Sequence, residues 1–102
     1  MSAYVLGAGA VLDLDEIWEY IAADNIGAAD RWIEKLFEAF KALGDTPRLG
    51  HRRGDLTDWP VLFWPIGAYL IIYRAESRPV EIVAVTQGSH SVPAFLSARV
   101  RQ

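Results

Sequence analysis

The chain has 102 residues and no cysteine, with a hydrophobic fraction of 52% and a formal net charge of −3 at pH 7. This length suits one domain, so we expect residues 1–102 to fold around a single dense core. Without cysteine the chain can form neither a disulfide framework nor a thiolate metal site. It has no signal-peptide pattern and no apolar run of the roughly 18 residues that a membrane span needs, which predicts a cytoplasmic protein without membrane contact.

Charge is divided unevenly between the two parts of the chain. Residues 1–45 carry three basic and nine acidic side chains, whereas residues 46–102 carry seven basic and four acidic ones. An acidic first part and a basic second part suggest two faces with different partners. The acidic total argues against general affinity for nucleic acid, and we expect no sequence-specific binding of nucleic acid by the chain alone.

The first part of the chain predicts a short strand and two helices. Ala3–Leu6 is an extended segment bounded by glycine, and apolar residues recur with helical spacing over Ala10–Ala23. A second amphipathic helix is expected to begin after the N-cap residue Asn25 and to end at Gly44, which would take a left-handed conformation ahead of Pro47. Because the break between the helices is very short, they should form an antiparallel hairpin.

The second part of the chain predicts a small sheet. Residues 45–58 form a polar loop rich in glycine and proline, and the strand that follows it is expected to end before Pro65. Val92–Arg101 could form a short C-terminal helix or remain loose. The three strand-like runs are Trp59–Trp64, Tyr69–Arg74 and Val80–Thr86.

Together these elements predict an α+β fold with the order β-α-α-β-β-β. The N-terminal strand joins one edge of a small, mainly antiparallel sheet, and the helical hairpin packs across one face of that sheet. Alternation along the last strand would place Glu81, Val83 and Val85 on one face and Ile82, Ala84 and Thr86 on the other.

Residue types that support catalysis are present but form no recognisable motif. Ser89, His90 and Ser91 are adjacent in sequence, which gives no triad geometry, and no nucleophile elbow surrounds them. His51 and His90 lack the spacing of metal ligands, so we expect no metal and no other cofactor. Asp13, Asp15 and Glu16 are expected in the first turn of the first helix, where the helix dipole favours them. Together with Glu19 they are interpreted as a solvated helix face and not as a general acid–base pair. The residues therefore predict a protein that acts by binding and is not an enzyme.

Basic side chains gather in the long loop and near the strand ends. Such residues could hold phosphate groups of a target, or they could simply be solvated, and spacing alone leaves both interpretations open. The candidate target contacts are Arg48, His51, Arg52, Arg53, Arg74 and His90.

Four segments taken together resemble the RelE/ParE superfamily of bacterial toxins, and within it the ParE side. Residues 14–40 (LDEIWEYIAADNIGAADRWIEKLFEAF) are similar to the helical hairpin of that family, and TPRLGHRR at 46–53 is similar to its P-x-x-G-x-x-R loop. WPIGAYLIIYR at 64–74 resembles its aromatic-rich strand hairpin, and VEIVAVTQG at 80–88 resembles its closing strand. The resemblance covers about residues 3–92, in the order and spacing of the family.

The resemblance implies the toxin of a type II toxin–antitoxin system. ParE-like members inhibit DNA gyrase, whereas RelE-like members cut mRNA in the ribosome without a metal. Such cleavage needs basic and tyrosine side chains, but Lys35 and Lys41 are the only lysines and neither Tyr nor Lys follows Tyr73, which favours gyrase. Two alternatives stay open: a ribosome-dependent mRNA endonuclease, and a decayed toxin that retains only antitoxin binding.

The decayed-toxin alternative arises where the chain departs from the family pattern. Leu62 stands where ParE relatives commonly have Arg, Gln87–His90 replaces an H-G-x-R segment, and Gly7 replaces the Ser that often caps the first helix.

The resemblance also implies a partner. In the family, the C-terminal segment of an antitoxin wraps the helical hairpin and the sheet, so a ParD-like antitoxin should form a hetero-oligomer with this chain. The part of that segment that contacts the basic second half should itself be acidic. The candidate antitoxin-binding residues are Trp18, Ile21, Trp32, Trp59 and Trp64.

Overall fold

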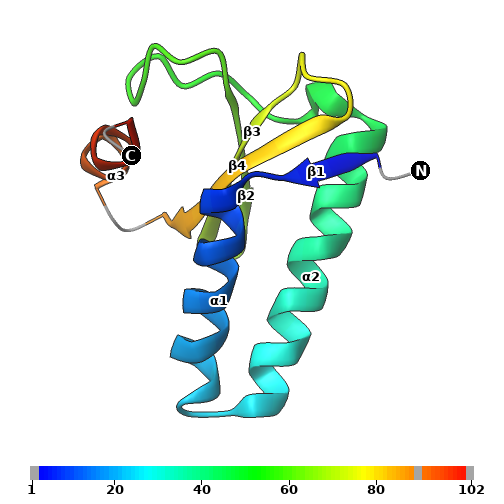
Figure 1. Cartoon of the computed structure of the whole chain (residues 1–102), viewed down its shortest axis with the longest axis vertical. Coiled ribbons are helices and arrows are strands. Elements are labelled where there is room, and N and C mark those ends of the chain that lie inside the picture. Colours follow the sequence, from blue (N-terminus) through cyan, green and yellow to red (C-terminus); the bar gives the residue numbers. More distant parts are fainter. Residues whose placement is uncertain (1–2, 89–90, 101–102) are drawn as a thin grey trace.

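The order of elements along the chain is the predicted one. The computed structural model describes residues 3–88 and 91–100, and a four-stranded sheet with a helical hairpin on one face forms its centre (Figure 1). The α+β fold class is therefore confirmed. The elements are β1 (Tyr4–Leu6), α1 (Ala8–Ala22), α2 (Ile26–Asp45), a short 3₁₀ helix (Pro47–Leu49), β2 (Leu62–Ile66), β3 (Tyr69–Arg74), β4 (Val80–Gln87) and α3 (Val92–Val100).

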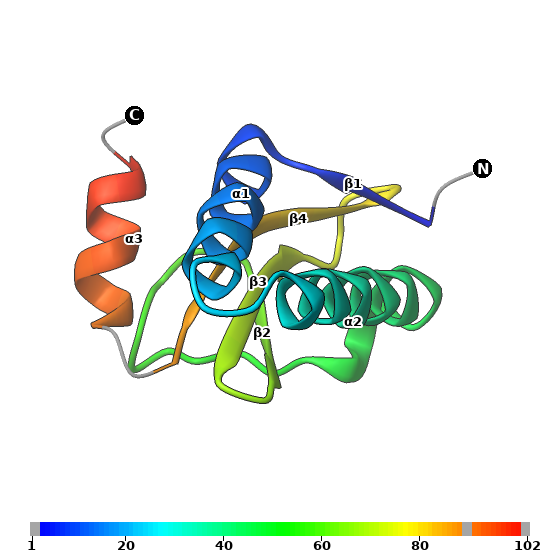
Figure 2. The same ribbon diagram turned by 90° about the horizontal axis from the view of Figure 1, so that it is seen from below.

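The helical hairpin forms where the apolar periodicity predicts it. The side chain of Asn25 accepts a hydrogen bond from the backbone N–H of Ala28 at 2.9 Å, so the predicted N-cap of α2 is confirmed. Near the tip of the hairpin, the indole Nε1 of Trp18 donates to Asp30 at 2.9 Å and joins α1 to α2. Figure 2 shows the two helices side by side across the sheet.

The end of α2 differs from the prediction. Gly44 lies inside the helix, which continues to Asp45, and among the described residues only Gly67 has a positive φ. A Cβ atom added at Gly44 would lie 2.6 Å from the Cβ of Ala3, so the close approach of the N-terminal segment explains the glycine. The helix ends because Pro47, two residues later, cannot donate to the preceding turn.

The sheet has the strand order β1-β4-β3-β2. β1 pairs with β4 in parallel, and the other two pairs are antiparallel, which confirms both the meander and the edge position of the N-terminal strand. β1 is thus the first strand in sequence, yet it contacts the last one.

The first strand of the meander was predicted too early in the chain. β2 begins at Leu62 and runs through Pro65, although we expected it to end before that proline. It tolerates Pro65 because β2 is an edge strand. Phe63 uses its outward backbone groups to pair with His51, at 2.8 and 2.9 Å, and Pro65 two residues later faces the same outer side. The missing N–H therefore removes no bond to β3.

Strict alternation along β4 was also a wrong prediction. The register against β3 shifts by one residue because Val83 is an extra residue, so β4 contains a β-bulge there. As a result Ile82 and Val85 both pack into the core beneath the helical hairpin, whereas Ala84 packs on the opposite face.

Apolar side chains fill both faces of the sheet. The cluster beneath the helical hairpin includes Leu14, Ile17, Leu36, Phe40, Leu43, Ile71, Tyr73, Ile82 and Val85. α3 forms, as one of the two alternatives predicted, and it covers the opposite face (Figures 1 and 2). The buried members of this second cluster are Val61, Phe63, Leu70, Ile72, Ala84, Val92 and Leu96. Within residues 3–88 and 91–100, no helix is long and apolar enough to span a membrane.

Candidate functional site

The hydroxyl group of Tyr73 fixes the loop that follows α2. It donates to the carbonyl oxygen of Pro47 at 2.7 Å and accepts from the N–H of Gly50 at 2.8 Å. The ring is fully buried, and this burial raises the pKa of the Tyr73 hydroxyl, so it stays protonated as a donor at neutral pH. The P-x-x-G loop and the tyrosine of YLIIYR, two separate motifs in the sequence, are therefore two halves of one contact.

A cleft of about 640 Å³ opens beside this loop. It lies between the loop, the start of β2 and the turn that joins β3 to β4. Its lining brings together three of the predicted target contacts, Arg48, His51 and Arg52. Two carboxylates, those of Asp45 and Glu76, line it as well.

The other predicted target contacts are not part of this cleft. Arg53 forms a bidentate pair with Asp55, at 2.8 and 3.0 Å, and the hydrogen bonds from Arg53 lower the pKa of that carboxyl group. Arg74 lies 3.5 Å from a carboxylate oxygen of Glu81. Their charges are thus offset locally. His90 lies outside the described residues.

Arg78 also lines the cleft, and sequence reasoning missed it. Its Nη1 donates to the carbonyl oxygens of Ala75 and Ser77, at 2.9 and 3.3 Å. No motif surrounds Arg78 in the sequence. The available signal was topological, because in an antiparallel meander the turn after β3 lies at the same end of the sheet as the start of β2.

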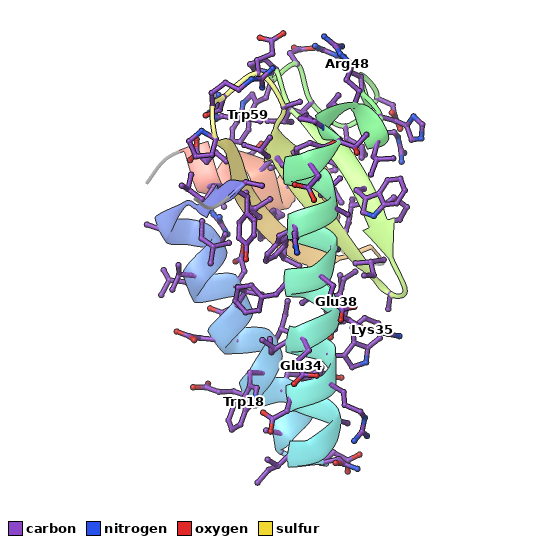
Figure 3. The ribbon with its side chains drawn as sticks, turned by 90° about the vertical axis from the view of Figure 1, so that its right-hand side faces the viewer. Trp18, Glu34, Lys35, Glu38, Arg48 and Trp59 are labelled. Carbon is purple, nitrogen blue, oxygen red and sulfur yellow. The ribbon has the colours of Figure 1, made fainter. Side chains whose placement is uncertain are left out.

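The predicted antitoxin-binding residues do not share one surface. Trp18, Ile21 and Trp32 lie on the helical hairpin, and Trp64 lies on β2 against the same core. Trp59 instead packs against the second cluster, on the opposite face of the sheet. Figure 3 shows Trp18 towards the tip of the hairpin and Trp59 at the opposite end of the molecule.

Several apolar side chains of the helical hairpin are exposed. On α1, Leu12 and Tyr20 are 61% and 72% exposed, and Val11 and Trp18 are partly exposed. On α2, Ile26 is 62% exposed at the tip. The four residues of α1 are spread around its solvent side rather than along one stripe, with acidic residues between them, and this side of the hairpin differs in character from the basic cleft.

Asp13 is buried, so its predicted place on a solvated helix face was wrong. The first-turn prediction for Asp13, Asp15 and Glu16 was wrong too, because α1 begins at Ala8 and its first turn holds no acidic residue. Its carboxylate accepts from the N–H of Val85 at 3.0 Å and from Arg99 of α3 at 2.8 Å. Arg99 also donates to the carbonyl oxygen of Val83 at 3.2 Å, so the two side chains bind the backbone groups exposed by the bulge. Burial raises the pKa of Asp13 and outweighs the hydrogen bond from Val85 and the charge of Arg99, which lower it.

Neither of these arrangements forms a metal centre. No group of three or more His, Cys, Asp or Glu side chains within the described part of the chain could hold a metal ion. The basic cleft and the exposed apolar side chains of the hairpin are the candidate binding surfaces.

A sequence model described as "ParE toxin of type II toxin-antitoxin system, parDE" matches residues 4–92. The chain belongs to this family. The toxin role in a toxin–antitoxin system, predicted from the four motifs, is thereby confirmed. The family match ends at the first residue of α3.

The fold of this ParE family toxin is also similar to a solved structure described as "Chromosomal ParDE TA system from P. aeruginosa". The two chains have a TM-score of 0.68 and 19% sequence identity, over 85% of this chain and 96% of the other. At this identity the similarity concerns the fold alone. No curated protein is significantly similar in sequence to the chain.

Proposed function

We propose that this ParE family toxin inhibits DNA gyrase and is neutralised by direct binding of a cognate, ParD-like antitoxin. The observation that carries the proposal is the family match over residues 4–92. Inhibition would occur by binding to the gyrase, with no metal or other cofactor and no catalytic step by the toxin itself.

The positions of the basic and phenolic side chains support inhibition over mRNA cleavage. The hydroxyl of Tyr73 is already engaged by Pro47 and Gly50, so it is not free to transfer a proton to a substrate. Lys35 and Lys41 lie on α2 and neither lines the cleft, and the Nζ of Lys35 lies 5.0 Å from the centroid of the Trp32 ring. A ribonuclease at the cleft would have neither lysine nor a free tyrosine hydroxyl among the described residues that line it.

A DNA-damage (SOS) reporter strain tests the choice of target. When this chain is induced alone, we expect growth arrest with strong reporter activation, since a stalled gyrase leaves broken DNA. Arrest with a silent reporter would contradict gyrase inhibition and favour mRNA cleavage. Normal growth with accumulated, folded protein would favour a decayed toxin.

The exposed apolar side chains of the hairpin support antitoxin binding there. Leu12 and Tyr20 are the most exposed of its large apolar side chains on α1, and burying them would stabilise a complex. Leu12→Ser and Tyr20→Ser should leave the fold intact but weaken the complex with the antitoxin encoded by the adjacent gene. Ala94→Ser, on the exposed side of α3, is the control. Equal affinity of all three variants, measured by calorimetry, would refute this placement.

A further inference from the structure

Three arginines from two segments of the chain line the cleft beside the loop. Arg48 and Arg52 come from the loop after α2, and Arg78 comes from the turn between β3 and β4. Within the described residues, none of the three forms an ion pair with a carboxylate. No carboxylate offsets their charges there, unlike those of Arg53 and Arg74.

The backbone that carries these arginines is held in place. The Tyr73 hydroxyl joins Pro47 to Gly50 and thereby sets the position of Arg48, which lies between them. The backbone pair between His51 and Phe63 then attaches the next residues to the edge of the sheet. A fixed backbone reduces the entropy lost when the side chains close on a ligand.

Arg78 is oriented by the turn itself. Because its Nη1 is bound to the carbonyl oxygens of Ala75 and Ser77, its remaining N–H groups are the ones that can bind a ligand. A planar guanidinium held along one edge suits an oxyanion that accepts two parallel hydrogen bonds, and a phosphate group is such an oxyanion.

The rest of the cleft favours a nucleotide over an acidic peptide. Asp45 and Glu76 supply acceptors, and the start of β2 supplies an apolar wall. A nucleotide uses all three kinds of group, because its phosphate is an anion, its sugar and base carry donors, and its base has an apolar face. The two carboxylates repel the anionic group of either ligand, but a nucleotide presents its anion, its donors and its apolar face within the span of one small cleft. The volume of about 640 Å³ is within the range of roughly 300–1,000 Å³ usual for small-molecule sites.

We propose that this cleft binds a nucleotide, with the phosphate held by Arg48, Arg52 and Arg78. The nucleotide is either free or one unit of a nucleic-acid strand, such as the DNA that a gyrase holds. The inference rests on the proposed function, because it assigns a ligand to the surface that would meet the target. Because the arginines would contact phosphate groups, binding of a strand should weaken as the salt concentration rises.

Binding to the purified full-length toxin tests the inference directly. Adenosine monophosphate, adenosine and a fluorescent single-stranded oligonucleotide are the probes, followed by calorimetry and fluorescence anisotropy. Arg48→Gln and Arg52→Gln should each weaken binding of the phosphorylated probes about tenfold. Arg31→Gln removes the same charge from an exposed position on α2 and should have no effect. Each arginine lost should reduce the salt slope of oligonucleotide binding by about 0.7.

The outcomes separate the two sources of phosphate. Binding of both adenosine monophosphate and the oligonucleotide, with no binding of adenosine, supports a site that takes a single nucleotide. Binding of the oligonucleotide alone supports a strand as the ligand. No binding of either probe overturns the inference, and so does equal binding by the Arg48→Gln, Arg52→Gln and Arg31→Gln variants. A glutamate-rich peptide that binds in their place would overturn it in favour of a protein partner.

This experiment is independent of the reporter assay. A toxin that activates the DNA-damage reporter but binds no nucleotide overturns the nucleotide site and leaves gyrase inhibition standing. Variant-sensitive nucleotide binding with a silent reporter contradicts gyrase inhibition and leaves the nucleotide site standing.

Discussion

Replacement of Arg99 by methionine should destabilise this toxin strongly and in a pH-dependent way. The side chain of Arg99 is 17% exposed, and that of its partner Asp13 is 8% exposed. Arg99→Met keeps much of the apolar stem but removes the charge and the bonds to Asp13 and Val83. Loss of one partner from a fully buried pair costs about 3–5 kcal/mol, whereas a surface pair is worth about 0–1 kcal/mol.

Because the pair is mostly buried but still partly accessible to solvent, we expect Arg99→Met to lower the free energy of unfolding by about 2–3 kcal/mol at neutral pH. For a domain of this size, that loss lowers Tm by about 10–20 °C. Urea unfolding followed by tryptophan fluorescence measures the free energy, with Arg31→Met as the matched control on the exposed side of α2. In the Asp13→Asn background, Arg99→Met should cost about 1–2 kcal/mol less, since no buried carboxylate is left unpaired.

The pH dependence follows from the raised pKa of Asp13. Between the ordinary value of 3.8 and the higher folded-state pKa, the native protein binds more protons than the unfolded chain, so its stability falls as pH rises. Loss of Arg99 removes a charge that lowers this pKa, which raises the pKa further and extends the fall to higher pH. The cost of Arg99→Met should therefore be largest at neutral pH and smallest below 3.8, where Asp13 is protonated in both states. A cost that is independent of pH, or below about 0.5 kcal/mol, would refute this reasoning.

Three further substitutions test the packing around the fold and the cleft. Tyr73→Phe leaves the buried N–H of Gly50 without its acceptor and should cost about 1–3 kcal/mol in urea unfolding, with faster proteolysis of the loop. Gly44→Ala should cost about 1–3 kcal/mol by the same assay, because its Cβ would overlap the N-terminal segment. Gly54→Ala is the control, since a Cβ at Gly54 has no atom within 4 Å and should change stability little. Equal effects of the two variants would contradict the packing argument. Gly67→Ala should lower Tm, because alanine would have to adopt a φ of +57° with its Cβ against the Trp32 ring. A Tm within about 2 °C of the parent protein would contradict the left-handed conformation of residue 67.

Local signals in the sequence predicted most of the fold. The apolar periodicity and the cap at Asn25 defined the helical hairpin, and the β-branched and aromatic residues of β3 defined the centre of the sheet. These features depend on neighbours within a few residues, so a sequence pattern contains them. The family resemblance, based on four such segments, was confirmed over residues 4–92.

The errors arose where a distant segment decides the local structure. Gly44 marks close packing against Ala3, and Pro65 is tolerated because the strand lies at an edge. The bulge at Val83 depends on Asp13 and Arg99, neither of which is near it in the sequence. No window along the chain contains these partners together.

The candidate site was only partly predictable for the same reason. Arg48, His51 and Arg52 were found because they share one loop, whereas Arg78 joins them only through the meander. The ion pairs that occupy Arg53 and Arg74 depend on side-chain geometry that charge counting does not contain. Whether these residues contact a target stays a prediction.

The pairing of β1 with β4 also has a consequence for synthesis on the ribosome. Tyr4 pairs with Val80, and Asp13 binds Val85, so the first elements made dock on the last strand made. Until β4 has emerged, the helical hairpin has no complete sheet to cover, and its apolar side stays exposed on the nascent chain. The fold of this toxin can therefore be completed only after β4 has been synthesised, however early the helical hairpin itself has formed.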